Sequence, residues 1–583
     1  MLHTRKLWSL LSVLMVLALL VAACAPAATP APTQPPAPTT PPEPTKAPEP
    51  TKGPEPTKAP EPTATAVPSK WAKYEAPDCE YGGLMKSIEA VDATTVKFTM
   101  CAPDPAFPSK VAFSSVGIHS AAHLEATGGK PLEDALGTGP YKVKEWIRGD
   151  QLVLEANPEH WGEAPKTPTV IFKWNTEAAA RFTALRAGDV DAIDNPDPND
   201  FEAASTDSTL QLIPREALNV FYIGLNNTKP PLDNEKVRQA IAMGIDRQAI
   251  VDKFYPPGSS VASHFTPCAI PGGCEGEEWY KYDLDAAKKL LADSGVKLPI
   301  KVSLAYRDVV RGYLPSVSQV AQEIQAQLKK LNIDATIDVQ ESGTFLDNAS
   351  NGNLEIFLLG WGADYPDATN FLDSHMGTGA NDSFGKKWDD ITGPLAKAAS
   401  LSDQAERNKL YAEANDAIRL HVPMIPVAHG GSATVWKATA EGAHSSPLGN
   451  ESFKVVEIPG QDTFVWMQNA EPLSLYCADE TDGETLRACE QIFDPLLSYK
   501  IGGTAVEPGL ATECKANDEL TEWTCTLREG VKFSDGTPLT AEDVVATYAV
   551  QWDAANPLHV GNTGNFDYCT YLFTAFLNPK PAQ

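Results

Sequence analysis

A long proline-rich segment limits where this 583-residue chain can build a folded core. Residues Ala25 to Ser69 hold 16 of its 49 prolines and almost no large apolar side chain, and KAPEPT, KGPEPT and KAPEPT follow one another from Lys46. Such a segment cannot bury a core, and proline keeps it near the extended polyproline conformation. We therefore expect a tether over 24–69 and a folded body from Lys70. A proline-rich ligand for a partner domain is the alternative.

The residues before Cys24 have the pattern of a bacterial export signal. Two basic residues precede an apolar run from Leu7 to Leu20, and small residues lead up to the cysteine. This predicts a signal peptide over 1–23. LVAAC resembles a lipobox, which implies that Cys24 is lipidated and anchors the body in a lipid bilayer outside the cytoplasm, in the periplasm or at the cell surface. An uncleaved membrane anchor and a plain secretory signal are the alternatives.

The charge of the chain excludes some partners. Asp and Glu number 76 against 47 Lys and Arg, a formal net charge of −29. Such a surface is a poor partner for nucleic acid or for a bare anionic membrane. No segment indicates a cofactor or nucleotide site. His119 and His123 stand four residues apart without a third ligand nearby, so we expect no metal there and a solvated helix face instead.

Hydrophobic spacing predicts an α/β fold in the middle of the chain. One face of an expected helix carries apolar residues three or four positions apart, namely Val317, Val320, Ile324, Leu328 and Leu331. Residues 333–339 then alternate as a strand does. LEIFLLGWGAD (Leu354 to Asp364) reads as a buried strand that emerges into a cleft. Because open α/β sheets bind ligands at the carboxyl ends of their strands, we expect the site near Asp364.

Ordered segments over nearly the whole body resemble one protein family. They are EPLSLYCADETDGETLRACEQIFDPLLSY (471–499), EWTCTLREGVKFSDGTPLTAEDVVATY (522–548), VKFTMCAPDPAF (96–107), GTGPYKVKEW (137–146), NPEHWG (157–162), LNNTKPPLDNEKVRQAIAMGIDR (225–247), YDLDAAKKLLADSG (282–295), FLLGWGADYPDATNFLD (357–373) and PLGNESFKVVE (447–457). In these segments the chain is similar to family 5 extracellular solute-binding proteins, which deliver peptides, nickel chelates or sugars to ABC importers. The resemblance implies a two-lobed α/β fold of the type II periplasmic-binding-protein kind with an extra small subdomain. It also implies no enzymatic activity, no cofactor and an ABC permease as partner.

These segments stand in a rearranged order, because the two that open the family come last and the family's next segment begins near Trp71. We therefore predict a circular permutation whose joint lies near 458–462, between strands that should lie side by side. The expected parts of the body are the second part of an accessory subdomain (70–130), lobe I (131–224), lobe II (225–428), lobe I again (429–496) and the first part of the accessory subdomain (497–583). The chain should cross between lobes near 222–226 and 427–431.

The resemblance implies ligand contacts on lobe II. In peptide-binding members of the family, the aspartate of a G-W-x-x-D pattern pairs with the α-amino group of the ligand. Trp361 and Asp364 have this spacing here. The alternative for Asp364 is a cap or turn residue. Trp361 and Tyr365 are expected either as aromatic walls of the site or as core residues.

The resemblance implies further contacts on lobe I. Thr481, Asp482 and Gly483 match the stretch that lends main-chain groups to a bound peptide, and backbone recognition would give broad specificity. A surface loop is the alternative there. Capture would shift the two lobes toward a closed form that docks on the permease, and the ligand can do so only through preferential affinity for that form.

Export permits disulfides among the cysteines that follow Cys24. Three possible pairs are close in sequence, namely Cys268 with Cys274 around a tight turn, Cys514 with Cys525 around a predicted hairpin, and Cys477 with Cys489. Cys79 and Cys569 lie beside the predicted new ends, and we expect a disulfide between them that staples the cut. Cys101 is then left as a buried free thiol.

Other functions are compatible with parts of the sequence. An extracytoplasmic hydrolase of peptide or glycan could use Asp364 and Asp367 as a carboxylate pair, although the chain lacks known hydrolase signatures. A receptor for a nickel chelate or an oligosaccharide shares the expected fold. A passive adhesin on a stalk would explain the tether but not the body. The sequence favours a receptor for a small solute, most of all a peptide.

Overall fold

The computed structural model describes residues 69–307 and 311–579. The predicted signal peptide, Cys24 and the predicted tether up to residue 68 lie outside these residues. Within the described ranges, no helix combines the length and the apolar character needed to cross a membrane.

Lobe II is built on a six-stranded sheet. In spatial order its strands are β10 (Ser260–Val261), β14 (Met424–His429), β9 (Asn219–Leu225), β13 (Ile356–Gly362), β11 (Ile300–Arg307) and β12 (Ile333–Gln340). Its helices are α6 (Glu235–Gly244), α7 (Arg247–Phe254), α8 (Leu284–Asp293), α9 (Val317–Lys330), α10 (Ser342–Ser350), α11 (Leu372–Met376), α12 (Asp389–Ala398) and α13 (Gln404–His421). The predicted helix corresponds to α9, whose apolar face is buried from Val317 to Leu328. The run at 354–364 corresponds to β13, which pairs with β9 and β11 inside the sheet.

Lobe I is built on a seven-stranded sheet. In spatial order its strands are β4 (Tyr141–Ile147), β5 (Gln151–Ala156), β6 (Thr169–Trp174), β16 (Thr463–Gln468), β7 (Ala192–Asp194), β15 (Ser432–Lys437) and β8 (Leu210–Arg215). Its helices are α4 (Ala178–Ala187), α5 (Phe201–Thr206) and α14 (Gly483–Ile492). The predicted joint is a tight turn in which the Gln461 N–H donates to Ile458 O at 3.0 Å and Gly460 has a φ of +84°. The strands on either side of it are not neighbours, because β7 lies between β15 and β16.

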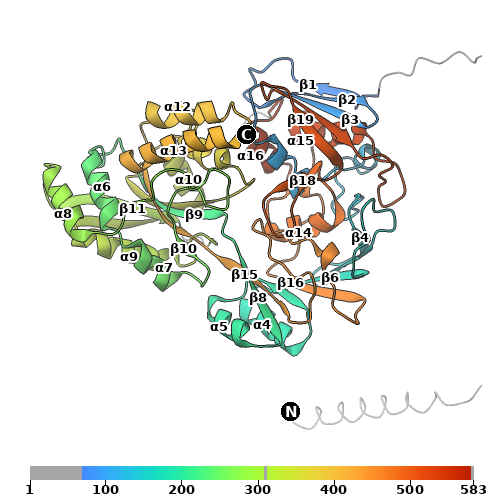
Figure 1. Cartoon of the computed structure of the whole chain (residues 1–583), viewed down its shortest axis with the longest axis horizontal. Helices are drawn as coiled ribbons and strands as arrows, with labels where there is room; N and C mark the ends of the chain where they lie inside the picture. The colour runs from blue at the N-terminus through green and yellow to red at the C-terminus, as the bar shows by residue number, and fades with distance from the viewer. Residues whose placement is uncertain (1–68, 308–310, 580–583) are drawn as a thin grey trace, which may run out of the picture. The chain divides into compact units, whose positions relative to one another are not determined.

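The accessory subdomain combines the first and the last described segments of the body. Its five-stranded sheet has the order β1 (Lys73–Glu75), β2 (Met85–Asp92), β3 (Thr95–Met100), β20 (Glu522–Leu527) and β19 (Ala511–Ala516). Its helices are α2 (Phe107–Lys110), α3 (Ala121–Ala126), α15 (Ala541–Trp552) and α16 (Asp567–Phe573), and β17 (Leu497–Tyr499) pairs with β18 (Val506–Pro508) beside it. Figure 1 shows the blue strands β1 to β3 beside the red β19 and α15.

Backbone pairing closes this sheet across the sequence. β3 and β20 run antiparallel, with Val96 opposite Cys525 and Phe98 opposite Trp523. Near the two ends of the body, the Leu84 N–H donates to Phe573 O at 2.9 Å. The segments that are farthest apart in the chain therefore share one sheet and one core.

Two short connections join the sheets of the lobes. The first, residues 216–218 between β8 and β9, comes earlier than the expected 222–226, of which 222–225 lie inside β9. The second, Gly430 and Gly431 between β14 and β15, falls within the expected range. Asn219 ties the two together, because its Nδ2 donates to Gly430 O and its Oδ1 accepts from Gly430 N–H, both at 2.8 Å.

The disulfides differ from the expectation at one place. The structure joins Cys268 to Cys274, Cys477 to Cys489, Cys514 to Cys525 and Cys79 to Cys101. The expected pair of Cys79 with Cys569 is therefore wrong, and within the described residues Cys569 rather than Cys101 is the buried free thiol. The reason is strand register, since Met85 of β2 lies opposite Met100 of β3 and so brings Cys101 to the segment that precedes β2.

Candidate functional site

Asp364 lies just after the carboxyl end of β13, an inner strand of the lobe II sheet. β13 ends at Gly362, and the chain then turns into a short 3₁₀ helix at Ala368–Asn370. Asn370 holds this turn, because its Oδ1 accepts from the Asp364 N–H at 3.0 Å and from Trp361 Nε1 at 3.1 Å. Its Nδ2 donates to Asp364 Oδ2 at 2.9 Å. A single buried amide thus fixes both members of the G-W-x-x-D pattern.

The environment of Asp364 favours a cationic partner. Burial raises the pKa of its carboxyl group to about 6, although the hydrogen bond from Asn370 acts in the opposite direction. Among the described residues, no lysine, arginine or histidine forms an ion pair with it. A carboxylate that is mostly removed from water and bonded only to a neutral amide gains strongly from a charged hydrogen-bond donor.

The turn is capped by a different aspartate. Asp367 Oδ1 accepts from the Thr369 N–H at 3.0 Å, and Arg407 forms a two-pronged ion pair with Asp367 at 2.7 and 2.9 Å. Burial alone would raise the pKa of Asp367, but the Arg407 guanidinium holds it below its usual range. Asp367 is therefore committed to structure and cannot serve as the second carboxylate of a hydrolase pair with Asp364. Asp364 itself is not used as the cap.

The two aromatic residues near Asp364 lie in different surroundings. Trp361 is half-buried, and its ring meets that of His375 edge-on at 4.9 Å. Tyr365 is buried against the core of the accessory subdomain, where Lys110 Nζ lies 5.2 Å from its ring centre. Tyr365 thus joins lobe II to the accessory subdomain, while Trp361 stays on the lobe II side.

The lobe I segment forms the start of α14. Asp482 is the N-cap of this helix, with its Oδ1 accepting from the Thr485 N–H at 2.9 Å, and Thr481 and Gly483 are exposed beside it. Asp482 Oδ2 is buried, and no described residue donates a hydrogen bond to it. Burial raises the pKa of this carboxyl group. The segment therefore presents an incompletely satisfied carboxylate in addition to main-chain groups.

Tyr568 on α16 lies within the electrostatic reach of both segments. Burial raises its pKa, and the negative charges of Asp364 and Asp482 raise it further. The position of α16 is set by Asp479, whose carboxylate accepts from the backbone N–H groups of Gly564 at 2.8 Å and Phe566 at 2.7 Å. Carboxylates from the two lobes therefore act on one tyrosine of the accessory subdomain.

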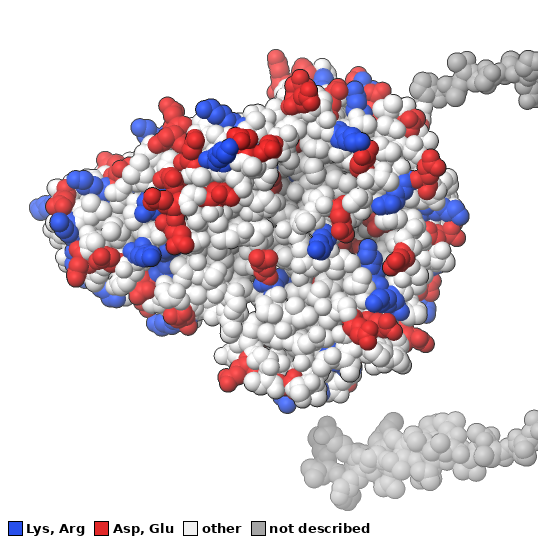
Figure 2. Space-filling model, viewed as in Figure 1, with Lys and Arg blue, Asp and Glu red and all other residues white. Residues whose placement is uncertain are grey.

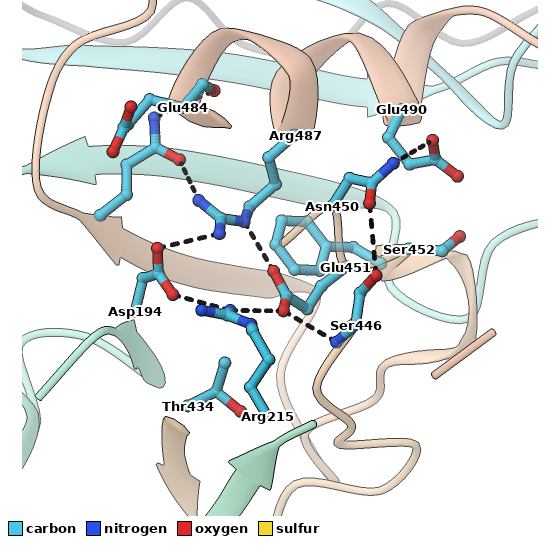
Figure 3. A network of polar contacts seen from close by, with 12 residues as sticks. Asp194, Arg215, Thr434, Ser446, Asn450, Glu451, Ser452, Glu484, Arg487 and Glu490 are labelled. Carbon is cyan, nitrogen blue, oxygen red and sulfur yellow. Dashed lines mark hydrogen bonds and ion pairs between the residues drawn. The ribbon is translucent and has the colours of Figure 1, made fainter. Parts of the chain in front are cut away.

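A buried charge network fixes α14 to lobe I (Figure 3). Arg487 of α14 donates to Glu451 Oε2 at 2.7 Å and to Asp194 Oδ2 at 2.9 Å. Arg215 of β8 donates to the same two carboxylates at 2.6 and 2.8 Å. The four side chains are at most 9% exposed, so each charge is balanced within a closed ring. The ring holds the amino end of α14, and hence Asp482, in a fixed place.

The charges on the outer surface follow no such pattern. Figure 2 shows acidic and basic side chains interspersed over this face, without a large field of one sign.

The expectation of a solvated helix face at His119 is wrong, because His119 precedes α3 and is buried against Tyr476 and Phe493. Burial lowers the pKa of His119 to about 3. Among the described residues, no group of three or more His, Cys, Asp or Glu is arranged to hold a metal ion.

Comparison with known proteins identifies the family. The model of bacterial extracellular solute-binding proteins, family 5, matches residues 61–383 and 505–567, which together are more than half of the chain. The chain belongs to this family. Family 5 proteins are transport receptors rather than enzymes, and their fold is the two-lobed type II periplasmic-binding-protein fold.

Individual members of family 5 are similar over about two thirds of the chain. Di/tripeptide-binding protein 1 of Pseudomonas aeruginosa is 31% identical over 383 residues, which are 64% of this chain and 71% of that protein. Heme-binding protein A of Haemophilus influenzae is 28% identical over 386 residues, or 65% and 71% of the two chains. The structure of HbpA2 from Haemophilus parasuis has a TM-score of 0.61 at 30% identity and covers 65% of this chain and 76% of that one.

Two residues of the candidate site escape sequence reasoning in this family 5 chain. Asn370 has a recognisable signal, because an Asn six residues after the Asp of G-W-x-x-D can reach back across a turn. Tyr568 has none. It lies more than 200 residues after Asp364 in the sequence, and its place is set by packing into the core of lobe I, where its ring meets that of Phe113 edge-on at 4.8 Å.

Proposed function

We propose that this protein captures peptides that carry a free α-amino group and delivers them to an ABC importer. The observation that carries the proposal is Asp364, a mostly buried carboxylate at the end of β13 that lacks a cationic partner among the described residues. An α-ammonium group supplies the missing charge and several hydrogen-bond donors. The similarity to a di/tripeptide-binding protein supports the same ligand class.

The capture step follows from the position of the groups. Asp364 belongs to lobe II, whereas Asp482 and the start of α14 belong to lobe I, so a ligand that contacts both favours the closed arrangement. The short connections at 216–218 and Gly430–Gly431 absorb the movement between lobes. The closed form then docks on a membrane permease, and the ATPase of the importer supplies the energy.

We further propose that the receptor works outside the cytoplasm as a lipoprotein. The export signal at 1–23 and the LVAAC motif support lipidation at Cys24. The segment 24–69 then serves as a tether, which at about 3.1 Å per residue spans at most roughly 140 Å. The tether leads into the accessory subdomain, so the attachment would be made through this subdomain and would leave lobe II free to move.

The order of the parts is proposed to be a circular permutation of the family. Support comes from the sheet of the accessory subdomain, where β3 and β20 pair although they come from opposite ends of the body. The family model also matches two separate stretches of the chain, 61–383 and 505–567, which lie on opposite sides of the proposed joint. A fold depends on its contacts rather than on where its ends lie.

The proposed ligand is tested by calorimetric titration of the purified full-length protein with Ala-Ala and with N-acetyl-Ala-Ala. We expect Ala-Ala to bind and the acetylated form to bind at least about tenfold more weakly, because a charge-assisted hydrogen bond is lost. Asp364→Asn should weaken Ala-Ala binding by about 10- to 100-fold and remove the difference between the two ligands. Asp347→Asn, an exposed position on α10, is the matched control and should change neither affinity.

Three results would contradict the proposal. The acetylated dipeptide could bind as well as the free one, or the Asp364→Asn protein could keep full affinity for Ala-Ala. Alternatively, titration could reveal binding of a nickel chelate, an oligosaccharide or heme with no affinity for any dipeptide. Release of free alanine during the titration would instead support the hydrolase.

A further inference from the structure

A pocket of about 450 Å³ lies between lobe II and the accessory subdomain. Lobe II contributes Tyr365, Asp373 and the segment 377–380, and the accessory subdomain contributes Asp104, Lys110 and Tyr571. This volume is within the range of small-molecule sites, roughly 300 to 1,000 Å³. The pocket does not include Asp364, and the proposed amine contact does not use it.

The charges that line the pocket do not cancel. Lys110 Nζ and Asp104 Oδ2 form an ion pair at 2.8 Å, and both side chains are at most 5% exposed, so these two charges offset each other. Asp373 also lines the pocket, and its Oδ2 is buried without a hydrogen-bond partner among the described residues. One negative charge is therefore left without compensation.

The groups that face Asp373 explain why it stays unpaired. Burial and the negative charge of Asp367 raise the pKa of Asp373 to about 7, while the positive charges of Arg407 and Lys110 lower it. Arg407 is already held by Asp367 through two hydrogen bonds, and Lys110 by Asp104. Neither cation is free to turn to Asp373, so its ionised form has no ion-pair partner among the described residues that line the pocket.

The pocket adjoins the expected position of the ligand's amino group. Tyr365, which lines it, follows Asp364 directly, and consecutive Cα atoms are about 3.8 Å apart. Tyr571 also lines it, and the charge of Asp364 contributes to the raised pKa of Tyr571, after burial and Asp567. The pocket and the expected amine contact therefore share one turn of lobe II, between the end of β13 and α11.

We propose that this pocket binds the positively charged side chain of the ligand's first residue, so that the receptor prefers peptides that begin with lysine or arginine. The inference rests on the proposed capture of peptides through Asp364 and adds a specificity to it. An ammonium or guanidinium group at Asp373 completes the charge balance of the pocket. It also joins lobe II to the accessory subdomain and so favours the closed form.

The test compares Lys-Ala with norleucine-Ala, which has nearly the same shape without the charge. Calorimetric affinities of the full-length protein at pH 8 should favour Lys-Ala by about tenfold or more, because the charged group meets a buried carboxylate. At pH 6 this ratio should fall toward one, since Asp373 is then mostly protonated. Protonation of Asp364 weakens both ligands alike and leaves the ratio unaffected.

Two variants separate the pocket from general peptide binding. Asp373→Asn should bring the ratio of the two affinities near one at pH 8, and the exposed control Asp347→Asn should leave it at the wild-type value. Gly379→Trp should also abolish the preference by filling the pocket, because a side chain at this exposed lining position meets no atom within 4 Å of its Cβ.

The outcomes distinguish this inference from the proposed function. Equal binding of Lys-Ala and norleucine-Ala by the wild-type protein overturns the pocket proposal and leaves peptide capture intact. A preference that survives both Asp373→Asn and Gly379→Trp overturns it as well. If neither dipeptide binds, peptide capture itself is wrong and the pocket proposal fails with it.

Discussion

Arg487 and Glu451 form a 2.7 Å ion pair that joins α14 to the loop before the tight turn at 458–462. Both side chains are almost completely enclosed, and burial of Glu451 would raise its pKa, but Arg215 and Arg487 hold it well below the usual range. The pair links residues on the two sides of this turn, the proposed permutation joint, so an ion pair as well as the backbone holds the two sides together. Removal of one partner leaves a buried charge without compensation.

Arg487→Met is therefore expected to lower the free energy of unfolding by about 3–5 kcal/mol, because Asp194 and Glu451 lose a shared cation. Urea denaturation followed by tryptophan fluorescence measures this change. Lys515→Met, which removes an exposed ion pair with Glu513, should cost at most about 1 kcal/mol. Equal effects of the two substitutions would mean that the network adds nothing beyond a surface pair.

The affinity for a free-amine dipeptide should depend on the ionisation of Asp364. Its pKa of about 6 in the free protein means that most of the carboxyl groups are ionised at pH 7 and few at pH 5. The ammonium group of the ligand stays charged over this range, so affinity should fall about tenfold between these values. Titrations with Ala-Ala at both pH values measure this, and in the Asp364→Asn protein the dependence should be flat.

Ionisation of Asp364 should also lower the stability of the folded protein. A folded-state pKa above the unfolded value means that the native protein binds more protons, so stability falls as pH rises from about 4 to 6 and stays lower above that. We expect Asp364→Asn to raise the melting temperature at pH 8 but not at pH 4. A variant that melts lower than wild type at pH 8 would show that the negative charge stabilises the unliganded protein. A substitution that raises stability but weakens binding, as expected for Asp364→Asn, is common at functional residues.

Cysteine chemistry offers a test of the subdomain core. Cys569 is buried among aromatic side chains, and its thiol should resist alkylation until the protein unfolds. A peptide map of the oxidised protein should contain a Cys79–Cys101 link. Loss of this link in Cys101→Ala should cost about 3 kcal/mol, whereas Cys569→Ser should leave all disulfides in place. A link from Cys569 to any other cysteine would contradict the structure.

If the proposed permutation is correct, a chain rearranged into the family's order should keep the fold. A rearranged chain that begins at Gln461, runs to residue 583 and continues from 69 to 460 keeps every sheet pairing. We expect far-UV circular dichroism and dipeptide affinity close to those of the natural order. As a control, new ends between Ile223 and Gly224, inside the central strand β9, should prevent folding. Failure of the first rearrangement alone would count against the permutation.

The spacing of apolar residues predicted α9 and β13 of lobe II, because the pattern within each short segment is enough to identify the element. The apolar positions of α9 and the continuous run of β13 are properties of short segments, and both match the structure. The capping role of Asp367 and the contacts of Asn370 were not predictable in the same way. They depend on the turn between β13 and α11, whose geometry no periodicity encodes.

The errors arose where distant segments decide the outcome. Cys79 was assigned by its position in the chain, whereas the register of β2 with β3 selects Cys101. His119 was assigned by its spacing from His123, whereas the packing of Tyr476 and Phe493 buries it. The first lobe crossing was displaced because β9 joins the lobe II sheet at its first residue, Asn219.

The pairing of Lys97 with Glu522, which are 425 residues apart, bears on biosynthesis. During translation β3 is made early, whereas its neighbour β20 is made only near the end. One edge of β3 therefore has no strand to pair with while almost the entire body is synthesised. An unpaired strand edge invites association with other chains. Export in an unfolded state would spare the cell this risk, since the sheet would then form only after the whole chain has left the ribosome and crossed the membrane.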